Sequence, residues 1–483
     1  MDLGNRKYYG PFYLMIWTLG RIGLADIYPG WLQVDAGHIL NYATFLISVL
    51  ASFVVARKFV RPRTAAIVAV LFFSQPLLFG HAFVNEKDTP FMAFFSLAVA
   101  LGMVAVDSLL DSPAGHADEN PREQLKASFS LEVERLKRFT LDHPLLMWAI
   151  LICLVGKVLL LAGLPTQAWI DMLVERAYQS ESGSIVNWLF ARVAENAGAL
   201  PASAYAAKAS VWLMRLRLVA SSILGAVTFG LLGMTLSISL RPITNKPRVA
   251  ALLIIIAGLA TGLAISVRIA GPLAGVLVSL YILSSGRRWA IAPLVVYWFA
   301  AGVATVLTWP YLWTGPLSHF VQAAQVMANF ETHLVLFNGQ PLQSTSLPWT
   351  YLSTLLLFEL TLPALLSFIW GSVKLAGKLA AGDLAAGKAA ILVPWLGIPF
   401  LAVEIMRTPL YGNLRQALFI IPPIFIIGTF GIEDILRRVR SGWLAALILL
   451  IALLPSLVSL WRLHPYQFAY FNFLAGGPQK AAE

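Results

Sequence analysis

Long apolar runs alternate with short polar connections along most of this chain. Runs of about 18 or more apolar residues are long enough to cross a hydrocarbon core of about 30 Å as helices. The pattern therefore predicts an all-α polytopic membrane protein with about twelve transmembrane helices, some of them short because they tilt or end at a buried site. The expected spans are 36–57, 63–80, 90–108, 143–163, 213–238, 248–267, 271–285, 289–308, 349–373, 389–405, 414–432 and 442–461.

Basic residues between the runs set the expected orientation. Five basic clusters fall on alternate connections, so one orientation places all of them in the cytoplasm, as the positive-inside rule requires. The clusters are Arg57/Lys58/Arg61/Arg63, Arg241/Lys246/Arg248, Arg287/Arg288, Lys374/Lys378/Lys388 and Arg437/Arg438/Arg440. The other connections then lie on the outer face, and they hold the unusual polar residues of the chain.

Composition supports a membrane protein and excludes a soluble multi-domain enzyme. Apolar residues make up 58% of the chain and charged residues 12%, whereas a typical soluble domain has about 25% charged residues. The net charge of +11 comes from the basic clusters, so we expect membrane lipids and no nucleic acid as partners. Cys153, the only cysteine, lies in an apolar run, where we expect it to pack in the core.

This topology divides the chain into membrane-spanning and surface segments. They are an outer juxtamembrane segment, 1–35; membrane helices with an outer motif loop 81–90, 36–108; a cytoplasmic amphipathic loop, 109–142; membrane helices with an outer helical loop 164–212, 143–308; an outer substrate loop, 309–348; membrane helices, 349–461; and an outer tail, 462–483. The mixed charges of 109–142 favour a helix on the membrane surface.

The first segment raises a question of topology. Residues 1–35 show no signal peptide, because no basic region precedes an apolar stretch. Segment 8–24 is apolar but rich in glycine and aromatic residues, which favours a helix lying at the membrane surface. An outer N-terminus needs an upstream segment to carry it across, so we expect a missing first helix and about thirteen helices in all. The alternative is that 8–24 is itself a span.

The outer connection His81–Pro90 packs several ionisable side chains between two spans. We expect the Asp88 carboxylate to face a cavity, as a general base on an acceptor hydroxyl or as a ligand of a divalent cation. Glu86 could take either role, and Lys87 could pair with a carboxylate or with a phosphate. The alternative is structural, with Asp88 or Thr89 capping the following helix.

Two arginines lie at outer ends of apolar runs, against the positive-inside bias. They are Arg268, in LAISVRIAG, and Arg415, in YGNLRQ. An arginine inside the membrane is costly unless it is paired or its guanidinium reaches the interface, which is the structural alternative at a helix end. A lipid phosphate fits as their partner, because guanidinium binds phosphate in a bidentate fork.

Outer loop 309–348 is rich in aromatic, amide and hydroxyl side chains. Such a mixture suits a sugar, because aromatic rings cover its apolar face while amides and hydroxyls bind its hydroxyl groups. The alternative for Trp309, Trp313 and Trp349 is the aromatic belt at the membrane interface. The chain has no P-loop, dinucleotide fingerprint, HExxH or GxSxG motif, so ATP-driven transport and serine or zinc hydrolysis lack support.

Several of these segments together resemble a known family. GHAFVNEKDTPFMAFF is similar to the GHsFnNPKDiPFaa segment of bacterial relatives of the protein O-mannosyltransferases, which are C-type (GT-C) glycosyltransferases that use polyprenyl-phosphate sugars. Further similar segments, in family order across nearly the whole chain, are DLGNRKYYGPFY, LAISVRIAG, WPYLW…VLFNGQPLQSTSLPWTYL, YGNLRQALFIIPP and RLHPYQFAYFNFLAGG. Each segment is weak alone, and their ordered combination is specific.

The resemblance implies a GT-C-like fold and an inverting transfer of a mannose-like hexose from a polyprenyl-phosphate donor to a protein, lipid or glycan acceptor. The reaction would take place on the outer face of a bacterial plasma membrane. A carboxylate would activate the acceptor hydroxyl, and arginine with a divalent cation (Mg²⁺ or Mn²⁺) would stabilise the leaving phosphate. The residues expected in these roles are Asp88 and Glu86 for catalysis, Arg268, Arg415 and Lys87 for the lipid phosphate, His81, Asn85, Gln340, Trp349, Tyr411 and His464 for substrate, and Asp88 for a metal.

The chain departs from the family pattern at both ends. The family carries an acidic catalytic residue just after its first transmembrane helix, whereas Asp2 is the only acidic residue near that point here, and it receives no catalytic role. Glu86 stands where the family often has proline, and the tail stops soon after Ala475-Gly-Gly. We therefore expect both ends to be clipped and the N-terminal catalytic loop to be missing.

Two other function classes stay open on the sequence. A secondary transporter or lipid flippase would show internal repeats and polar residues at the middle of the membrane. A non-catalytic membrane assembly partner is favoured if the acidic loop is truly absent. If the chain is a transferase, the outer helix ends should enclose a polar cavity open sideways to lipid, and Asp88, Arg268 and Arg415 should converge on it.

Overall fold

The computed structural model describes most of the chain. The described residues are 7–27, 32–110, 144–161, 168, 171–172, 247–283, 290–329, 332–383, 386–406, 409–439 and 441–477. The chain divides into two compact units, one with residues Met1–Gly115, Thr244–Tyr311 and Leu317–Glu483, and one with His116–Ile243 and Leu312–Pro316. The described helix of the second unit is α7 (Pro144–Leu161), which matches the expected span 143–163. The expected segments 109–142, 164–212 and 213–238 lie almost entirely outside the described residues.

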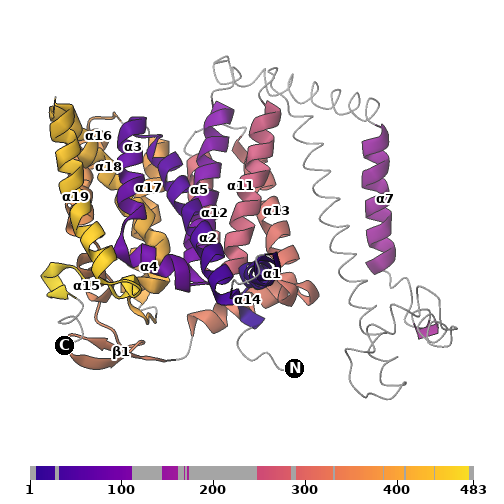
Figure 1. The fold of residues 1–483 in the computed structure, drawn as a ribbon. Coiled ribbons are helices and arrows are strands. Elements are labelled where there is room, and N and C mark those ends of the chain that lie inside the picture. Colours follow the sequence, from indigo (N-terminus) through magenta and orange to yellow (C-terminus); the bar gives the residue numbers. More distant parts are fainter. Residues whose placement is uncertain are drawn as a thin grey trace, which may run out of the picture. The chain divides into compact units, whose positions relative to one another are not determined.

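The remaining described elements are mostly helices (Figure 1). The helices are α1 (Phe12–Ile27), α2 (Gln33–Ala56), α3 (Pro62–Phe73), α4 (Pro76–Val84), α5 (Asp88–Leu110), α11 (Pro247–Val267), α12 (Pro272–Leu283), α13 (Ile291–Thr308), η4 (Pro310–Thr314), α14 (Pro316–Ala328), α15 (Tyr351–Glu359), α16 (Leu362–Ala380), α17 (Ala386–Met406), η5 (Asn413–Ile420), α18 (Ile421–Arg438), α19 (Gly442–Arg462), η6 (Gln467–Ala469) and η7 (Phe473–Ala475). Two short strands, β1 (Leu334–Phe337) and β2 (Gln340–Gln343), form a hairpin.

The length and composition of these helices define an all-α membrane protein. The described residues contain six helices long and apolar enough to cross a membrane, or up to eight if each of two bent helix pairs forms one span. The six are α2, α5, α11, α13, η5 continuing into α18, and α19. The expected number of twelve spans is not confirmed.

Two of the expected spans are broken rather than straight. The run 63–80 forms α3 and α4, which meet at a bend of 62°, and the run 349–373 forms α15 and α16, which meet at 117°. Pro76 stands in the first turn of α4, and the residue before it, Gln75, is extended, because the proline ring disfavours a helical conformation in the preceding residue. Thr361 is extended directly before α16, whose second residue is Pro363.

Two surface segments differ in how well the sequence anticipated them. Segment 8–24 is mainly the helix α1, which Figure 1 shows end-on while the long helices are seen from the side, so α1 runs across their axis as expected of a surface helix. Loop 309–348, the expected outer substrate loop, contains the hairpin of β1 and β2, for which no strand was predicted. Asn338 and Gly339 form its turn with φ values of 51° and 72°, the left-handed pair that a two-residue hairpin turn requires.

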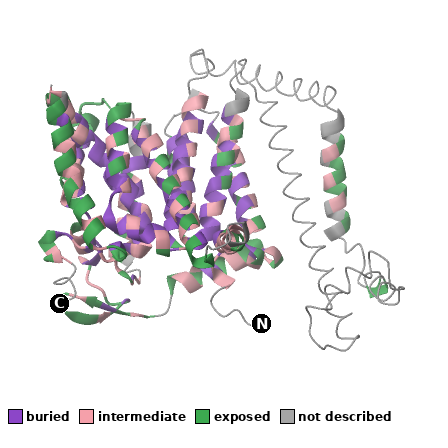
Figure 2. Ribbon diagram, viewed as in Figure 1, coloured by how far each residue is buried: buried purple, intermediate pink, exposed green. Residues whose placement is uncertain are grey.

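The core of the first unit is built around α5, which packs against α2, α11, α12 and η5. Buried residues make up 78% of the apolar window of α5 but only 11% of that of α19, a contrast that Figure 2 shows in the density of buried positions along the two helices. Small residues allow close approach: a Cβ at Gly258 or Gly262 of α11 would overlap backbone oxygens of α13. This spacing of small residues is typical of packed helices in membranes.

Candidate functional site

Polar side chains gather at two opposite ends of the helices around α5. One end, which we call the Asp88 end, contains the start of α5, the ends of α11 and α13, the hairpin, η5 and the C-terminal segment. The other, the Asp107 end, contains Lys58, which forms an ion pair with Asp107, and Lys374, which forms one with Asp434. The described members of the basic clusters at 57–63, 374–378 and 437–438 thus lie at the end opposite Asp88, as the sequence predicted.

The segment before α5 is held by a side-chain turn at Asn85. The Asn85 Oδ1 atom accepts hydrogen bonds from the backbone N–H groups of Lys87, at 3.1 Å, and Asp88, at 2.8 Å. The Thr89 hydroxyl donates instead to the His81 carbonyl, at 3.0 Å. Asn85 therefore caps this helix start, in the manner that asparagine favours. The alternative interpretation, in which Asp88 or Thr89 supplies the cap, is therefore wrong, and the Asp88 carboxylate pairs with other groups.

Asp88 forms ion pairs with two arginines from separate elements. One carboxylate oxygen, Oδ1, contacts the Arg268 guanidinium, and Oδ2 lies 3.5 Å from Arg415 Nε. The Asn85 side-chain amide also donates to Oδ2, at 3.1 Å. Arg268 directly follows α11 and Arg415 lies in η5. The structure therefore brings together the three residues that the sequence singled out, and we call Asp88, Arg268 and Arg415 the Asp88 cluster.

The cluster surrounds a buried carboxylate and carries excess positive charge, and its Arg415 side chain is 39% exposed. The Asp88 side chain is 4% exposed and that of Arg268 is 19% exposed, and one carboxylate faces two guanidinium groups. The buried Nε atoms of Arg268 and Arg415 and the buried Nδ1 atom of His81 have no hydrogen-bond partner among the described residues. Buried donors without partners are costly. An anion with several oxygen acceptors would satisfy both the charge and the donors.

Other predicted site residues surround the cluster or lie apart from it. Lys87 is exposed, with its Nζ atom 4.9 Å from the centre of the Tyr9 ring, and Glu86 is half-buried. The Tyr411 ring lies 5.4 Å from the Arg415 guanidinium carbon and 4.3 Å from the His333 ring. Tyr411 is thus brought to the cluster as expected.

Three predicted substrate residues lie on the surface of the Asp88 end. Gln340 is exposed at the start of β2, Trp349 is 73% exposed, and His464 is exposed beside Gln467 in the C-terminal segment. No hydrogen bond or ion pair among the described residues joins any of the three to the Asp88 cluster. Trp309, for which the alternative was a membrane-interface ring, is 1% exposed and donates to the Lys7 carbonyl, so it packs inside the protein.

Sequence reasoning missed a buried polar network behind the cluster. The Gln75 amide, at the break between α3 and α4, donates to the Glu359 carbonyl at 2.9 Å and accepts from the Thr361 hydroxyl at 3.1 Å. The Glu359 carboxylate accepts from the N–H of Leu414, the residue before Arg415, at 3.3 Å. The two broken spans are thereby tied to each other and to η5. A lone glutamate inside an apolar run was the signal that could have found this network.

The residues at Asp88 do not fit a divalent cation. Two guanidinium groups already contact the carboxylate, and they would repel a second cation at the same oxygens. Among the described residues no three His, Cys, Asp or Glu side chains come close enough to hold a metal ion together. We therefore derive no step of a reaction through a metal.

Comparisons with known proteins found no match: no protein-family model, no curated protein and no solved structure is similar to this chain.

Proposed function

We propose that this protein transfers a hexose from a polyprenyl-phosphate donor to an acceptor hydroxyl, with inversion. The observation that carries the proposal is the Asp88 cluster, a buried group with two guanidiniums on one carboxylate at the ends of apolar helices. Such a group suits a phosphate attached to a lipid, because the phosphate needs positive charge and the lipid needs an apolar surface. The motifs that resemble bacterial O-mannosyltransferase relatives supply the reaction type.

In this proposal the two arginines hold the phosphate. Their buried Nε atoms have no hydrogen-bond partner among the described residues, and phosphate oxygens are strong acceptors for such donors. The acceptor hydroxyl oxygen attacks the anomeric carbon, and the bond from that carbon to the phosphate oxygen breaks. The phosphate leaves with the electron pair, and its developing charge is stabilised by Arg268 and Arg415.

Asp88 acts as a positioning residue, because both of its oxygens are engaged. The carboxylate oxygens already contact two guanidiniums and an amide, so neither is placed to take a proton from the acceptor hydroxyl. Its effect is to hold the two guanidiniums in place, as a fixed partner does for a binding residue. Glu86, half-buried two residues before Asp88, is the carboxylate that would take the proton from the acceptor hydroxyl.

The alternation of basic clusters places the Asp88 end on the outer face of a bacterial plasma membrane in this proposal. The donor would then enter the site sideways from the outer leaflet. Acceptors of three kinds, a protein, a lipid or a glycan, each offer the hydroxyl that the reaction needs.

The proposal is tested by turnover of a radiolabelled polyprenyl-phosphate hexose by the full-length protein in proteoliposomes. Arg268→Gln and Arg415→Gln keep hydrogen-bonding groups but remove charge, and each should lower the transfer rate by about 10²–10³-fold, as expected when a donor to a developing anion is lost. Arg437→Gln, an exposed arginine at the Asp107 end, serves as the matched control and should transfer at the wild-type rate. Equal rates for all three variants would contradict the proposal.

A second candidate function is a lipid flippase or transporter. The observation that favours it is the pair of broken spans, α3–α4 and α15–α16, whose breaks carry the buried polar residues Gln75 and Glu359, since interrupted helices line the binding sites of many transporters. Movement of a fluorescent polyprenyl phosphate across the bilayer, without any sugar transfer, would favour this function over the first.

A further inference from the structure

A pocket at the Asp107 end lies where three helices begin or end. Its lining residues come from the start of α3, from the end of α18 with the residue that follows it, and from the start of α19. Its volume is about 120 Å³, whereas a single water molecule needs at least about 10–15 Å³. The pocket therefore has room for several water molecules or for one small anionic group, at the end of the helices opposite the Asp88 cluster.

The charged residues that line this pocket leave an excess of positive charge. They are three arginines, Arg61, Arg63 and Arg437, and one carboxylate, Glu433. Glu433 Oε1 accepts a hydrogen bond from Arg437 Nε at 3.1 Å, and its Oε2 atom accepts from the Thr64 hydroxyl. Arg437 is thus committed to Glu433, its partner one helical turn away, and we assign it no part in binding. Arg61 and Arg63 supply the excess charge.

Arg61 and Arg63 keep donors for a ligand. Arg61 Nε lies 3.5 Å from Glu433 Oε1, farther than the 2.7–2.9 Å of a strong charge-assisted hydrogen bond. Arg63 is exposed and forms no ion pair with another described residue. Each guanidinium carries five N–H donors in a planar fork, and that fork matches the oxygens of a phosphate group.

The backbone at the start of α19 adds donors on another side of the pocket. Ser441, which lines the pocket, directly precedes α19, and no side chain caps this helix. The N–H groups of a first helical turn have no partner within the helix. Together with the helix dipole they favour an anion. The charge of the two arginines and these backbone donors therefore act on the same space.

The neighbouring side chains are typical of a membrane surface. The pocket lies at the ends of α18 and α19, both of which belong to segments long and apolar enough to cross a membrane. Trp443, two residues after Ser441, is 72% exposed, as indole rings at the level of lipid headgroups are. Basic pockets between membrane helices bind the anionic headgroups of lipids.

We propose that this pocket binds a phosphate group, held by Arg61, Arg63 and the backbone N–H groups at the start of α19. The phosphate belongs to an anionic phospholipid headgroup or to a soluble phosphate, and the exposed indole of Trp443 favours the lipid. An uncharged ligand would leave the excess charge of the two arginines uncompensated. The site is separate from the Asp88 cluster, so the inference does not depend on the proposed function.

Lipid binding to the full-length protein in detergent tests the site without any transfer reaction. Native mass spectrometry would compare phosphatidylglycerol, which carries a net negative charge, with phosphatidylcholine, which has a phosphate but no net charge. Wild-type protein should bind phosphatidylglycerol at least about fivefold more tightly. Arg61→Gln and Arg63→Gln should each weaken that binding by about fivefold, the usual effect of one basic residue on attraction to an anionic lipid.

A matched variant separates the pocket from general attraction between charges. Arg57→Gln removes one positive charge from an exposed residue at the same end that does not line the pocket, and it should bind phosphatidylglycerol within about twofold of the wild type. Arg61 and Arg63 are exposed as well, so all three variants should unfold at the wild-type temperature in detergent without lipid. Equal losses of binding in the three variants would overturn the proposal.

Inorganic phosphate, titrated into the same protein by calorimetry, identifies the source of the phosphate group. Preference for phosphatidylglycerol that is lost in Arg61→Gln and Arg63→Gln assigns the pocket to a lipid headgroup. Binding of inorganic phosphate that depends on the same two arginines, without any preference between the two lipids, assigns it to a soluble phosphate. If neither probe binds in a way that depends on Arg61 and Arg63, the proposal is overturned.

Discussion

The helix α5 carries an aspartate near each of its ends, and the two have different surroundings. Asp107 pairs with one cation, the Lys58 ammonium at 2.7 Å, and accepts a hydrogen bond from the Tyr281 hydroxyl at 2.6 Å. Asp88 pairs with two cations, Arg268 and Arg415. The side chain of Asp107 is 24% exposed and that of Asp88 is 4% exposed.

The difference separates an ion pair that is balanced in charge from a cluster that is not. Asp107 and Lys58 balance each other in charge, and their donors and acceptors are used within the protein. The Asp88 cluster has an excess positive charge around a more buried carboxylate, and the buried Nε atoms of Arg268 and Arg415 have no hydrogen-bond partner among the described residues. Uncompensated charge away from water is unstable unless a counter-ion binds. The proposed function uses this difference, because it places the donor phosphate at the Asp88 end and gives Asp107 itself a structural role only.

The largest expected effect comes from removing the charge at each end in turn. Asp88→Asn should lower hexose transfer by about 10²–10³-fold, because the two guanidiniums lose the carboxylate that positions them and the anion they hold is misplaced. Asp107→Asn, on the same helix, should transfer within about twofold of the wild-type rate, since Asp107 pairs with Lys58 at the opposite end of α5 from the Asp88 cluster. Initial rates with a polyprenyl-phosphate hexose in proteoliposomes measure both.

The kinetic constants of the same variants distinguish a positioning role for Asp88 from a role in acid–base catalysis. If Asp88 positions the arginines, Asp88→Asn should raise the donor KM as well as lower kcat, because phosphate binding is weakened. If Asp88 were the general base, kcat alone would fall. Equal losses from Asp88→Asn and Asp107→Asn would remove the distinction between the two ends altogether.

The second effect concerns stability at the Asp88 end. Gln75→Ala should lower the free energy of unfolding by about 1–3 kcal/mol, because it leaves the Glu359 carbonyl and both donors of Thr361 without their buried partner. Gln322→Ala, which removes an exposed amide on α14 that accepts from the Tyr311 hydroxyl, should change it by less than about 0.5 kcal/mol. Unfolding in mixed detergent micelles measures both, and a Gln75→Ala protein as stable as Gln322→Ala would show that the two broken spans are held by packing alone.

The sequence predicted the long helices and the Asp88 cluster better than it predicted the breaks between α3 and α4 and between α15 and α16. Long apolar runs identify α2, α5, α11, α13, α18 and α19, because hydrophobic length is a property of each segment by itself. Arg268 and Arg415 were found because they violate the positive-inside pattern, and their meeting at Asp88 followed from placing all three at one face. The hairpin turn at Asn338-Gly339 was available as a direct signal and was missed.

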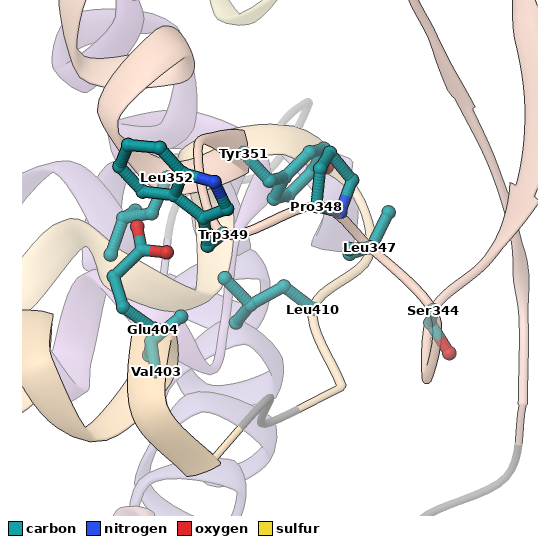
Figure 3. A pocket seen from close by; sticks show the side chains of 9 residues that line it. All are labelled: Ser344, Leu347, Pro348, Trp349, Tyr351, Leu352, Val403, Glu404 and Leu410. Atoms are coloured by element: carbon teal, nitrogen blue, oxygen red, sulfur yellow. The ribbon is translucent and has the colours of Figure 1, made fainter.

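The features that the sequence did not predict depend on contacts between distant segments. Averaged hydropathy hides a single Gln75 or Glu359 in an apolar run, and only the folded chain shows that Gln75 bonds to Glu359 and Thr361 across 284 and 286 positions. The cap at Asn85 was predicted at the wrong residue because Asp, Asn and Thr are all good caps. The small pocket between residues 344–352 and 403–410 (Figure 3) could not be predicted, because its lining residues come from segments more than fifty positions apart.

A third effect tests how the N-terminal segment supports the Asp88 cluster. A Cβ at Gly10 would overlap the carbonyl oxygen of Ser266, two residues before Arg268. Gly10→Ala should therefore destabilise the protein by about 1–3 kcal/mol, as overpacking does, and it should also lower transfer. Gly23→Ala adds a methyl group in open space on the helix α1, and it should stabilise by about 0.5–1 kcal/mol through helix propensity. Stability and transfer are measured on both variants. A Gly10→Ala protein that behaves like Gly23→Ala would contradict the close contact between Gly10 and Ser266.

The smallest effect is expected at the Asp107 end. Arg437 lies one helical turn after Glu433, its Nε atom 3.1 Å from Glu433 Oε1, and its side chain is 60% exposed. Arg437→Ala should lower the free energy of unfolding by about 0.2–0.5 kcal/mol, the usual value for a pair with this spacing on a helix. Glu433 keeps a contact with Arg61 at 3.5 Å and the hydroxyl of Thr64, so its carboxylate is not left without partners. Because the Arg437 side chain is exposed, the loss should shrink further in high salt. A salt-independent loss of unfolding free energy well above about 1 kcal/mol would instead mean that the charges at the Asp107 end interact as strongly as those at Asp88. The two ends of α5 would then differ less than the exposed fractions of Asp88 and Asp107 indicate.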